Sequence, residues 1–277
     1  MNAYSRRIRE LLASVSPELI GERPAAPPPI RVPTQAFSDF LINREMGDWA
    51  EGLVLRAIER SGLGLSAVPY GRTENLVAGE PGFRDYYLAY RAELYSLGKR
   101  PDLLVYRGPP PDFGERNGEA LIPLASRALA GVEVRSSQQS LNGTRPPSEL
   151  SFTPKVEDIW NVARWIERHG VPHYYVQVLF GAVYGISFEA ILEHLAMGPK
   201  EGGFTVDKQP KNQFKSTIYL PLDKGTCLTT AFGWPKLAAF SRQLASGRML
   251  FGVRFSGGEA VFDACTLSGL IRLDGTE

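Results

Sequence analysis

Apolar residues recur along the chain with two periods, one typical of β-strands and one typical of α-helices. Two short runs rich in Val and Leu, at 100–106 and 131–137, are bounded by Gly, Pro or polar residues and predict strands. Further strands are predicted at 174–180 and 183–187. Apolar stripes at helical spacing predict helices at 4–20, 39–60, 83–97, 154–169 and 188–197. This alternation predicts an α/β fold in which a mixed central β-sheet is flanked by helices.

Three segments differ in composition and pattern. The run Pro24–Pro29 is too rich in proline to be helical and predicts an extended connector. Residues 1–33 are therefore expected to form an N-terminal helix followed by this connector. The alternation of strands and helices occupies residues 34–198, and residues 199–277 are expected to form a β-rich C-terminal extension.

Within the C-terminal extension, the pattern predicts strands at 216–222, 249–255 and 259–265 and a helix at 234–245. Between the two runs rich in Val and Leu, residues 107–127 are predicted to form a surface loop or a bent hairpin. Consecutive prolines and a glycine interrupt any periodic pattern there.

The composition is that of an ordinary globular protein. Hydrophobic residues make up 43% of the 277 positions, which is ample for a core, and the formal net charge is +1. This balance argues against a general polyanion-coating protein, although it is compatible with a local basic groove. The most apolar segment, 174–195, is interrupted by Gly181, Gly185 and Glu189, so we expect no membrane span.

Several kinds of site are poorly supported by the sequence. Cys227 and Cys265 lack the spacing of a zinc site or a disulfide framework, so a reducing cytoplasm is the default compartment. His169 and His173 lie four positions apart, but an intervening Gly and Pro prevent one helix from aligning them as metal ligands. The sequence has no phosphate-binding loop or dinucleotide fingerprint, so no nucleotide cofactor is expected.

Two acidic residues belong to the two runs that predict neighbouring strands. Alternate side chains on a strand share a face, so Glu133 and Arg135 point one way while Val132 and Val134 point the other way. If the two strands are neighbours, Asp102 lies beside Glu133. Two close carboxylates raise each other's pKa unless a cation lies between them, and Mg²⁺ is the usual cation for oxygen ligands.

A family resemblance rests on these residues. The dipeptide Pro-Asp at 101–102, followed by Glu-Val-Arg at 133–135 with 31 positions separating the two acids, resembles the signature of the PD-(D/E)XK nuclease superfamily. Arg135 stands where that superfamily usually has Lys. Downstream, the segments 152–158 and 170–178 resemble a type II restriction endonuclease of the AccI kind.

The resemblance implies a restriction-endonuclease-like core and a sequence-specific enzyme that hydrolyses double-stranded DNA with Mg²⁺ and leaves 5′-phosphate ends. Such an enzyme would serve a restriction-modification system in a prokaryotic cytoplasm. A palindromic target would be matched by a two-fold homodimer, because each active site cuts one strand. Two alternatives stay open: a repair or structure-specific nuclease on the same core, and a DNA-binding module that has lost catalysis, for which Arg135 is the main argument.

The resemblance also assigns roles to individual residues. Asp102 and Glu133 are expected to bind the metal ion. Arg135 is expected to contact the scissile phosphate but not to act as a base, because arginine keeps its proton in proteins. Lys155 is either a substitute for the usual lysine or an exposed residue in the first turn of a helix. Glu51 lies in a segment that resembles the first-helix glutamate of the superfamily, and it either acts near the metal or is an ordinary solvated glutamate.

Polar residues directly after position 135 are candidates for DNA contact. Amides can read adenine edges, Arg can read guanine, and hydroxyls reach phosphates. This series is either a DNA-contacting segment or a wet polar loop, and its members are Ser136, Ser137, Gln138, Gln139, Asn142 and Arg145. A basic cluster in the C-terminal extension either contacts DNA or is a solvated face, and it consists of Lys208, Lys211 and Lys215. The extension itself is expected to complete the sheet, grip DNA or form a dimer contact.

Overall fold

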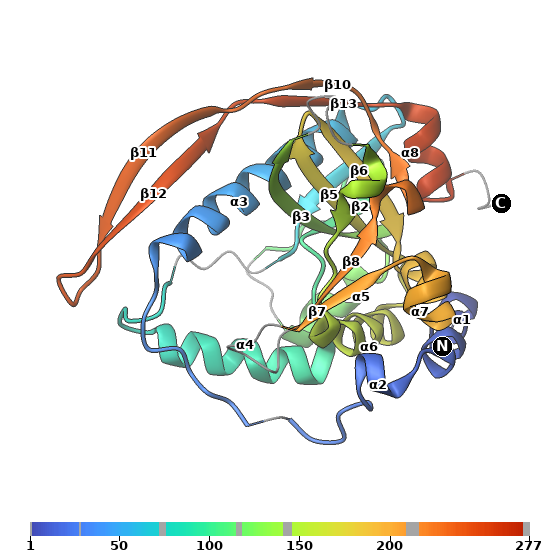
Figure 1. The fold of residues 1–277 in the computed structure, drawn as a ribbon, viewed down its shortest axis with the longest axis horizontal. Helices are drawn as coiled ribbons and strands as arrows, with labels where there is room; N and C mark the ends of the chain where they lie inside the picture. The colour runs from blue at the N-terminus through green and yellow to red at the C-terminus, as the bar shows by residue number, and fades with distance from the viewer. Residues whose placement is uncertain are drawn as a thin grey trace.

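The centre of the fold is a six-stranded β-sheet (Figure 1). The computed structural model of the chain describes residues 2–27, 29–71, 76–114, 118–140, 146–208 and 216–273. The strands of the sheet, in spatial order, are β1 (Leu65–Pro69), β2 (Leu103–Arg107), β3 (Ala130–Ser140), β5 (His173–Phe180), β6 (Ala182–Ser187) and β9 (Thr226–Cys227). β3 and β5 run parallel, whereas the other neighbouring pairs run antiparallel. The sheet is therefore mixed, as the sequence predicts.

Helices cover both faces of this sheet (Figure 1). The covering helices are α1 (Ala3–Ser14), α3 (Ser38–Glu59), α6 (Ile159–His169), α7 (Phe188–Gly202) and α8 (Ala264–Leu270). α1, α6 and α7 pack on one face, while α3 and α8 pack on the other. Side chains alternate along the strands, so Leu104 and Tyr175 lie in the first core and Leu103 and Val176 lie in the second. This arrangement confirms the predicted fold class.

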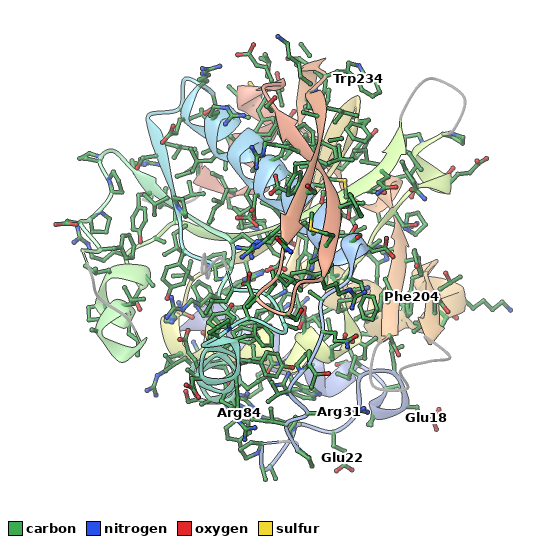
Figure 2. The ribbon with its side chains drawn as sticks, turned by 90° about the vertical axis from the view of Figure 1, so that its left-hand side faces the viewer. Glu18, Glu22, Arg31, Arg84, Phe204 and Trp234 are labelled. Atoms are coloured by element: carbon green, nitrogen blue, oxygen red, sulfur yellow. The ribbon has the colours of Figure 1, made fainter. Side chains whose placement is uncertain are left out.

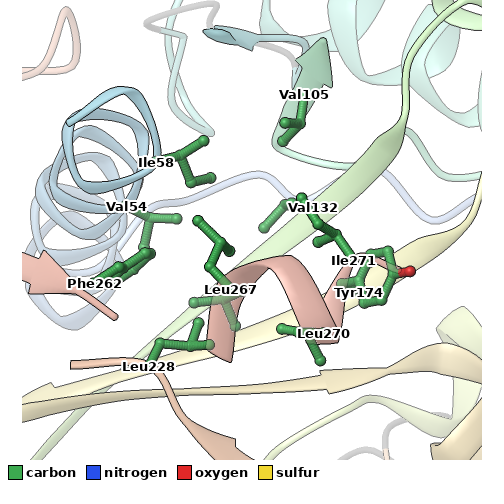
Figure 3. Close-up of a pocket in the computed structure, with 11 residues that line it drawn as sticks. Val54, Ile58, Val105, Val132, Tyr174, Leu228, Phe262, Leu267, Leu270 and Ile271 are labelled. Atoms are coloured by element: carbon green, nitrogen blue, oxygen red, sulfur yellow. The ribbon is translucent and has the colours of Figure 1, made fainter. Parts of the chain in front are cut away.

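The core beneath α3 and α8 is closely packed. Figure 3 shows a small cavity between these helices and the sheet, lined by apolar side chains such as Val54, Ile58 and Leu267. Its volume is about 10 Å³, which is room for one water molecule at most. This core therefore supports the sheet and is not a ligand site. Within the described ranges, no helix combines the length and the apolar character that a membrane span needs.

The C-terminal extension contributes to several parts of the fold. Its strands besides β9 are β7 (Thr205–Lys208), β8 (Ser216–Pro221), β10 (Thr229–Gly233), β11 (Lys236–Gln243), β12 (Met249–Ser256) and β13 (Glu259–Phe262). β9 adds the last strand of the central sheet, β8 lies between β7 and β4 (Ser151–Phe152), and β10 pairs with β13. β11 and β12 form a long hairpin that runs beside α3 and extends beyond the sheet (Figure 1).

Short helices account for some differences from the sequence prediction. They are α2 (Pro17–Ile20), η1 (Gly118–Leu121), α5 (Ile122–Ala125), η2 (Pro147–Glu149), η3 (Val156–Asp158) and η4 (Leu222–Lys224). The single helix predicted at 4–20 is split into α1 and α2, because Ser16 is not helical and its hydroxyl accepts the N–H of Glu18 at the start of α2. η1 and α5 occupy part of the segment 107–127, for which the sequence predicts a loop or a hairpin.

The largest correction concerns β11. The sequence pattern predicts a helix at 234–245, but the segment is a strand that pairs along its whole length with β12. Leu237 and Phe240 have the spacing of one helix face, yet they lie on opposite faces of the strand. Pairing with a partner strand overrides the local pattern here, as tertiary context often does.

Gly98 follows α4 (Phe83–Leu97) and fixes the direction of the chain toward the acids. Its φ is +90°, a conformation that glycine adopts without strain. A Cβ at this position would lie 2.3 Å from the backbone nitrogen of Trp165 and 2.5 Å from the carbonyl oxygen of Asn161. The next residue, Lys99, donates its N–H to that same oxygen at 2.9 Å. Glycine therefore lets the end of α4 lie directly against α6.

Replacing Gly98 by Ala is expected to lower the free energy of unfolding by about 3 kcal/mol or more, because the methyl group meets the backbone of α6 as well as an unfavourable φ. Gly62 is the matched control, since its φ is +79° and nothing lies within 4 Å of a Cβ placed there. Gly62→Ala is expected to cost about 1 kcal/mol. Chemical denaturation measures both losses, and equal losses would contradict the close approach at Gly98.

Candidate active site

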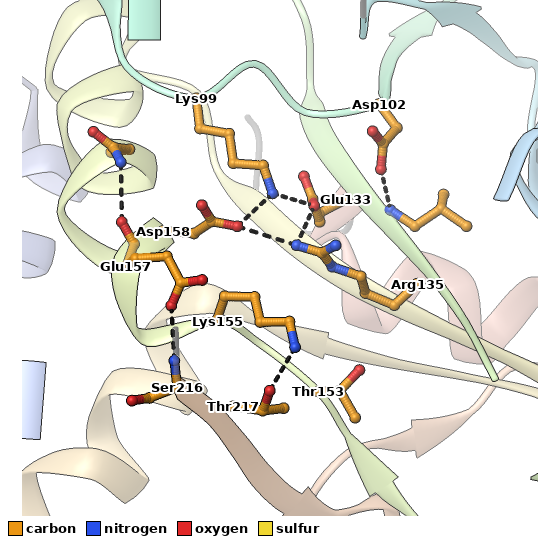
Figure 4. Close-up of polar contacts among 12 residues, drawn as sticks. Lys99, Asp102, Glu133, Arg135, Thr153, Lys155, Glu157, Asp158, Ser216 and Thr217 are labelled. Atoms are coloured by element: carbon orange, nitrogen blue, oxygen red, sulfur yellow. Dashed lines mark hydrogen bonds and ion pairs between the residues drawn. The ribbon is translucent and has the colours of Figure 1, made fainter. Parts of the chain in front are cut away.

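β2 and β3 lie side by side and bring the two predicted acids together. The strands pair antiparallel with Leu103 opposite Val132. Asp102 directly precedes β2, and its Oδ2 accepts the backbone N–H of Val134 at 2.7 Å (Figure 4). Asp102 is thereby anchored to the strand that carries Glu133, in the arrangement that the sequence predicts.

Strand alternation orients the side chains of β3. Val132 and Val134 pack in the core beneath α3, whereas Glu133 and Arg135 lie on the opposite side. There the Glu133 side chain is 2% exposed, and its Oε1 lies 2.9 Å from Nη2 of Arg135. A carboxylate this deeply buried needs compensating charge close by.

Lys99 and Asp158 supply the rest of that compensation (Figure 4). Nζ of Lys99 lies 2.5 Å from Oε1 of Glu133 and 2.8 Å from Oδ2 of Asp158. Nη2 of Arg135 lies 3.1 Å from the same Asp158 oxygen. Each of the two cations therefore contacts both carboxylates. We call these four residues the charge quartet, and its formal charges cancel.

The charge quartet sets the protonation of its members. Burial acts to raise the pKa of Glu133, but Lys99 and Arg135 outweigh it and hold that pKa below its ordinary value. The same balance lowers the pKa of Asp158. Burial acts to lower the pKa of Lys99 and of Arg135, and the two carboxylates outweigh it and raise both. All four groups are therefore charged at neutral pH.

Asp102 and Glu51 lie near the charge quartet, but its two cations do not compensate their negative charges. Burial, followed by the charges of Glu133 and Glu51, raises the pKa of Asp102 well above its ordinary value. Burial, followed by the charges of Asp48 and Glu133, raises the pKa of Glu51 on α3 to about 7. Negative charge is thus in excess where these acids approach one another, and a bound cation would be stabilised there.

Buried polar atoms without a hydrogen-bond partner also mark this centre. Among the described residues of β3 and β5, they are Glu133 Oε2, Arg135 Nε, Tyr175 Oη, Gln177 Nε2 and both ring nitrogens of His173. Glu133 is opposite Tyr175, and Arg135 is opposite Gln177, in the parallel pairing of the two strands. Buried polar atoms in native proteins nearly always have partners. This face of the sheet is therefore suited to bind a polar group or an ion.

Asp102 and Glu133 fit a magnesium site. Within the part of the chain that the structure describes, no three His, Cys, Asp or Glu side chains are grouped so that they alone could hold a metal. Mg²⁺ usually keeps several waters and takes one or two carboxylates from the protein, so two acids are sufficient. The unpartnered Oε2 of Glu133 and the uncompensated charge near Asp102 provide this donor set.

A half-open cavity of about 220 Å³ lies beside the acids. Asp102 and Lys99 line it together with Tyr86 and Tyr90 from α4. Gly71, which follows β1, contributes to the rim. Solvent therefore reaches Asp102 through the cavity.

Lys155 lies before the helix, whereas the sequence predicts a helix that begins at residue 154. It is extended and bridges to Thr217 on β8, and the helix begins after it with η3. Its Nζ donates to Oγ1 of Thr217 at 2.5 Å, and its charge helps to lower the pKa of Asp158. Lys155 is therefore near the charge quartet, but the lysine amine that contacts Glu133 belongs to Lys99.

The residues after Arg135 continue β3 as far as Ser140, beyond the strand that the sequence predicts at 131–137. Ser136 and Ser137 are half-buried, while Gln138 and Gln139 are exposed. The structure does not describe the side chains of the remaining candidates for DNA contact. Asn142, Arg145, Lys211 and Lys215 lie outside the described residues, and Lys208 is described only as the last backbone position of β7.

Two members of the charge quartet, Lys99 and Asp158, are absent from the residues that sequence reasoning selects. Lys99 did carry a signal, because it stands three positions before Asp102 and follows the glycine that ends a helix. Asp158 carries a weaker one. An acid near a helix start is explained equally well by the helix dipole, so nothing local distinguishes it.

Comparison with known proteins gives a match to the family model described as AccI restriction endonuclease. It covers residues 1–144 and 138–277, which together span the whole chain. Curated proteins and solved structures give no match. The match therefore includes the strands that carry Asp102 and Glu133 as well as the C-terminal extension, and this chain belongs to the AccI restriction endonuclease family.

Proposed function

We propose that the chain, a restriction endonuclease by family, is a Mg²⁺-dependent type II enzyme that cuts both strands of DNA at a specific sequence. The observation that carries the proposal is the convergence of Asp102 and Glu133, with an unpartnered carboxylate oxygen, beside an accessible cavity. The proposal includes 5′-phosphate ends and a role in a restriction-modification system. It also includes a homodimer, so that one active site serves each strand.

Asp102 and Glu133 would hold the metal ion, which when bound lowers the pKa of a water molecule and polarises the phosphate. Lys99 and Arg135 prepare Glu133 for this role in two ways. They keep its carboxylate ionised, and both contact Oε1, which leaves Oε2 for another ligand. The protein thus fixes the orientation of the carboxylate before any ligand binds.

Arg135 is well placed to contact the scissile phosphate. Its Nη2 is held by Glu133 and Asp158, while its Nε has no hydrogen-bond partner among the described residues. A guanidinium group offers several fixed donors, so the ion pairs leave capacity for a phosphate oxygen. Because Arg135 cannot give up its proton, its contribution is charge and orientation. Glu51, with a pKa of about 7, gives the site a group that can exchange a proton near neutral pH.

A DNA-binding module without catalysis is the second candidate. One observation favours it: Arg135 occupies the position of the usual lysine and is engaged in ion pairs. The position of Lys99 favours catalysis instead, because its amine reaches Glu133 from the end of α4 and supplies the missing lysine charge. We therefore prefer the nuclease.

Digestion of a sequenced plasmid with Mg²⁺ tests this function. Discrete fragments with 5′-phosphate ends are expected, and excess EDTA is expected to abolish cleavage, because no protein group replaces the charge of the ion at Asp102 and Glu133. Fragment-end mapping gives the target sequence and the ends. Smeared or nicked products would indicate a repair or structure-specific nuclease, and a gel shift without products would indicate the binding module.

The variant Asp102→Asn removes one metal-binding carboxylate with little change in shape. Cleavage is expected to fall by about a thousandfold or more, while DNA binding stays within a few-fold of wild type, since metal-ion catalysis supplies several kcal/mol. Asp39→Asn, at an exposed position on α3, is the matched control and should cleave normally. Single-turnover cleavage and gel-shift assays give the two quantities. Full activity in Asp102→Asn would end the assignment of the site.

Two lysine variants separate the role of Lys99 from that of Lys155. Lys99→Met is expected to slow cleavage by about a hundredfold or more, because it removes a charge that contacts Glu133 directly. Lys155→Met is expected to slow it less than about tenfold, because Lys155 is bound to Thr217 on β8. Cleavage rates are compared at a temperature where both variants are folded, as shown by thermal melting. The reverse order of the two effects would assign the lysine role to Lys155.

A further inference from the structure

The β11–β12 hairpin has an apolar face that is largely exposed to solvent. Pairing of the strands places alternate residues on two faces. One of these, which we call the outer hairpin face, consists of Leu237, Ala239, Ser241, Met249, Phe251 and Val253. Gln243 continues it at one end. At the other end Phe255 packs on Trp49 of α3, with 5.8 Å between the ring centroids, so Phe255 is not part of the exposed surface.

Large apolar side chains on the outer hairpin face are exposed to solvent. The exposed fractions are 61% for Leu237, 43% for Met249 and 64% for Phe251. Trp234, which precedes β11, is 58% exposed and stacks on Phe180 with 5.4 Å between the ring centroids. Figure 2 shows Trp234 at the periphery of the molecule. A cluster of large exposed apolar residues of this kind marks a surface that binds another protein.

The other face of the hairpin packs on the body of the protein around Phe240, Leu250 and Gly252, whereas Ala238 on the same face is exposed. Leu250 is buried, and a Cβ on Gly252 would lie 3.3 Å from Leu41 of α3. Arg242 forms an ion pair with Glu80 at 2.7 Å. These contacts hold the hairpin along α3, so the outer hairpin face is presented by a supported element.

Charge distribution indicates the kind of partner. Every charged residue of the two strands, namely Lys236, Arg242 and Arg254, falls on the other face, and the outer hairpin face carries none. A surface for the phosphate backbone of DNA would need cations. A surface without charge meets an identical surface without repulsion, and two-fold association brings identical patches together.

The number of catalytic centres per chain also indicates a second copy as the partner. Each chain supplies one pair of Asp102 and Glu133, whereas cleavage of a duplex needs a centre for each strand. We propose that the outer hairpin face is the surface on which a second copy of this chain docks. The choice of a second copy rests on the proposed function, because double-strand cleavage requires two centres.

Sedimentation velocity over a range of protein concentrations tests the interface. Phe251→Glu places a charge on the outer hairpin face. It is expected to weaken self-association by about a hundredfold, because Phe251 occurs once in each copy and a two-fold interface loses both of its contacts. Ala238→Glu is the matched control, since Ala238 is exposed on the other face of the same hairpin. Wild type and Ala238→Glu are expected to be dimers, and Phe251→Glu a monomer with an unchanged melting temperature.

Leu237→Glu provides a second variant on the outer hairpin face and should behave like Phe251→Glu. A monomeric wild type would overturn the proposal. So would a dimer that persists in both outer-face variants, or equal dissociation of the Ala238→Glu control. Loss of DNA binding in Phe251→Glu without any change in oligomeric state would assign the face to nucleic acid instead, and would overturn it as well.

The sedimentation experiment uses protein without DNA or added metal, so its result does not depend on catalysis. A wild-type dimer that cleaves no DNA would support the interface and refute the proposed function. A monomer that makes double-strand cuts would support the function and refute the interface. At concentrations where Phe251→Glu is monomeric, it is expected to nick supercoiled plasmid at least tenfold faster than it linearises it, because a single centre cuts one strand.

Discussion

The active-site region depends on the requirement that a buried charge have a partner of opposite sign. Glu133 is buried and Asp158 is half-buried near it, and this is tolerable because Lys99 and Arg135 each contact both carboxylates. Removing one partner from a buried ion pair typically costs about 3–5 kcal/mol of stability. Loss of any one of the four side chains is therefore expected to destabilise the whole cluster. The charge of Asp102 is not compensated in this way, so an added cation would stabilise its ionised carboxylate.

The fold meets this requirement with elements that are far apart in the sequence. Lys99 comes from the end of α4, Asp158 from η3, and Glu133 and Arg135 from a central strand. Gly131 serves the same purpose as the glycine between α4 and α6, because a Cβ there would lie 2.9 Å from Pro101 Cγ. Close approach at these two glycines lets the residue before β2 lie against β3. The geometry of the charges is therefore a result of backbone packing.

Prediction from sequence succeeded where one period of apolar residues determines the structure. The helix at 83–97 was predicted with its observed bounds, and the placement of Asp102 beside Glu133 followed from two recognisable strands. It failed where structure depends on contacts between distant segments. Lys99 reaches Glu133 because of how closely α4 approaches α6, and no local pattern records that distance. The segment 234–245 became a strand because β12 pairs with it, although its own residues favour a helix.

The far end of β3 differs from its beginning in how it is paired. From Gly131 to Ser136 the strand is in register with β5, and the register shifts between Ser136 and Ser140. Glu133 and Arg135 therefore belong to the regularly paired part of the strand, whereas the exposed Gln139 lies beyond it. A regular ladder of backbone hydrogen bonds resists displacement, and an irregular one is locally disrupted. The far end of β3 can therefore change position while the carboxylate and the guanidinium group keep theirs.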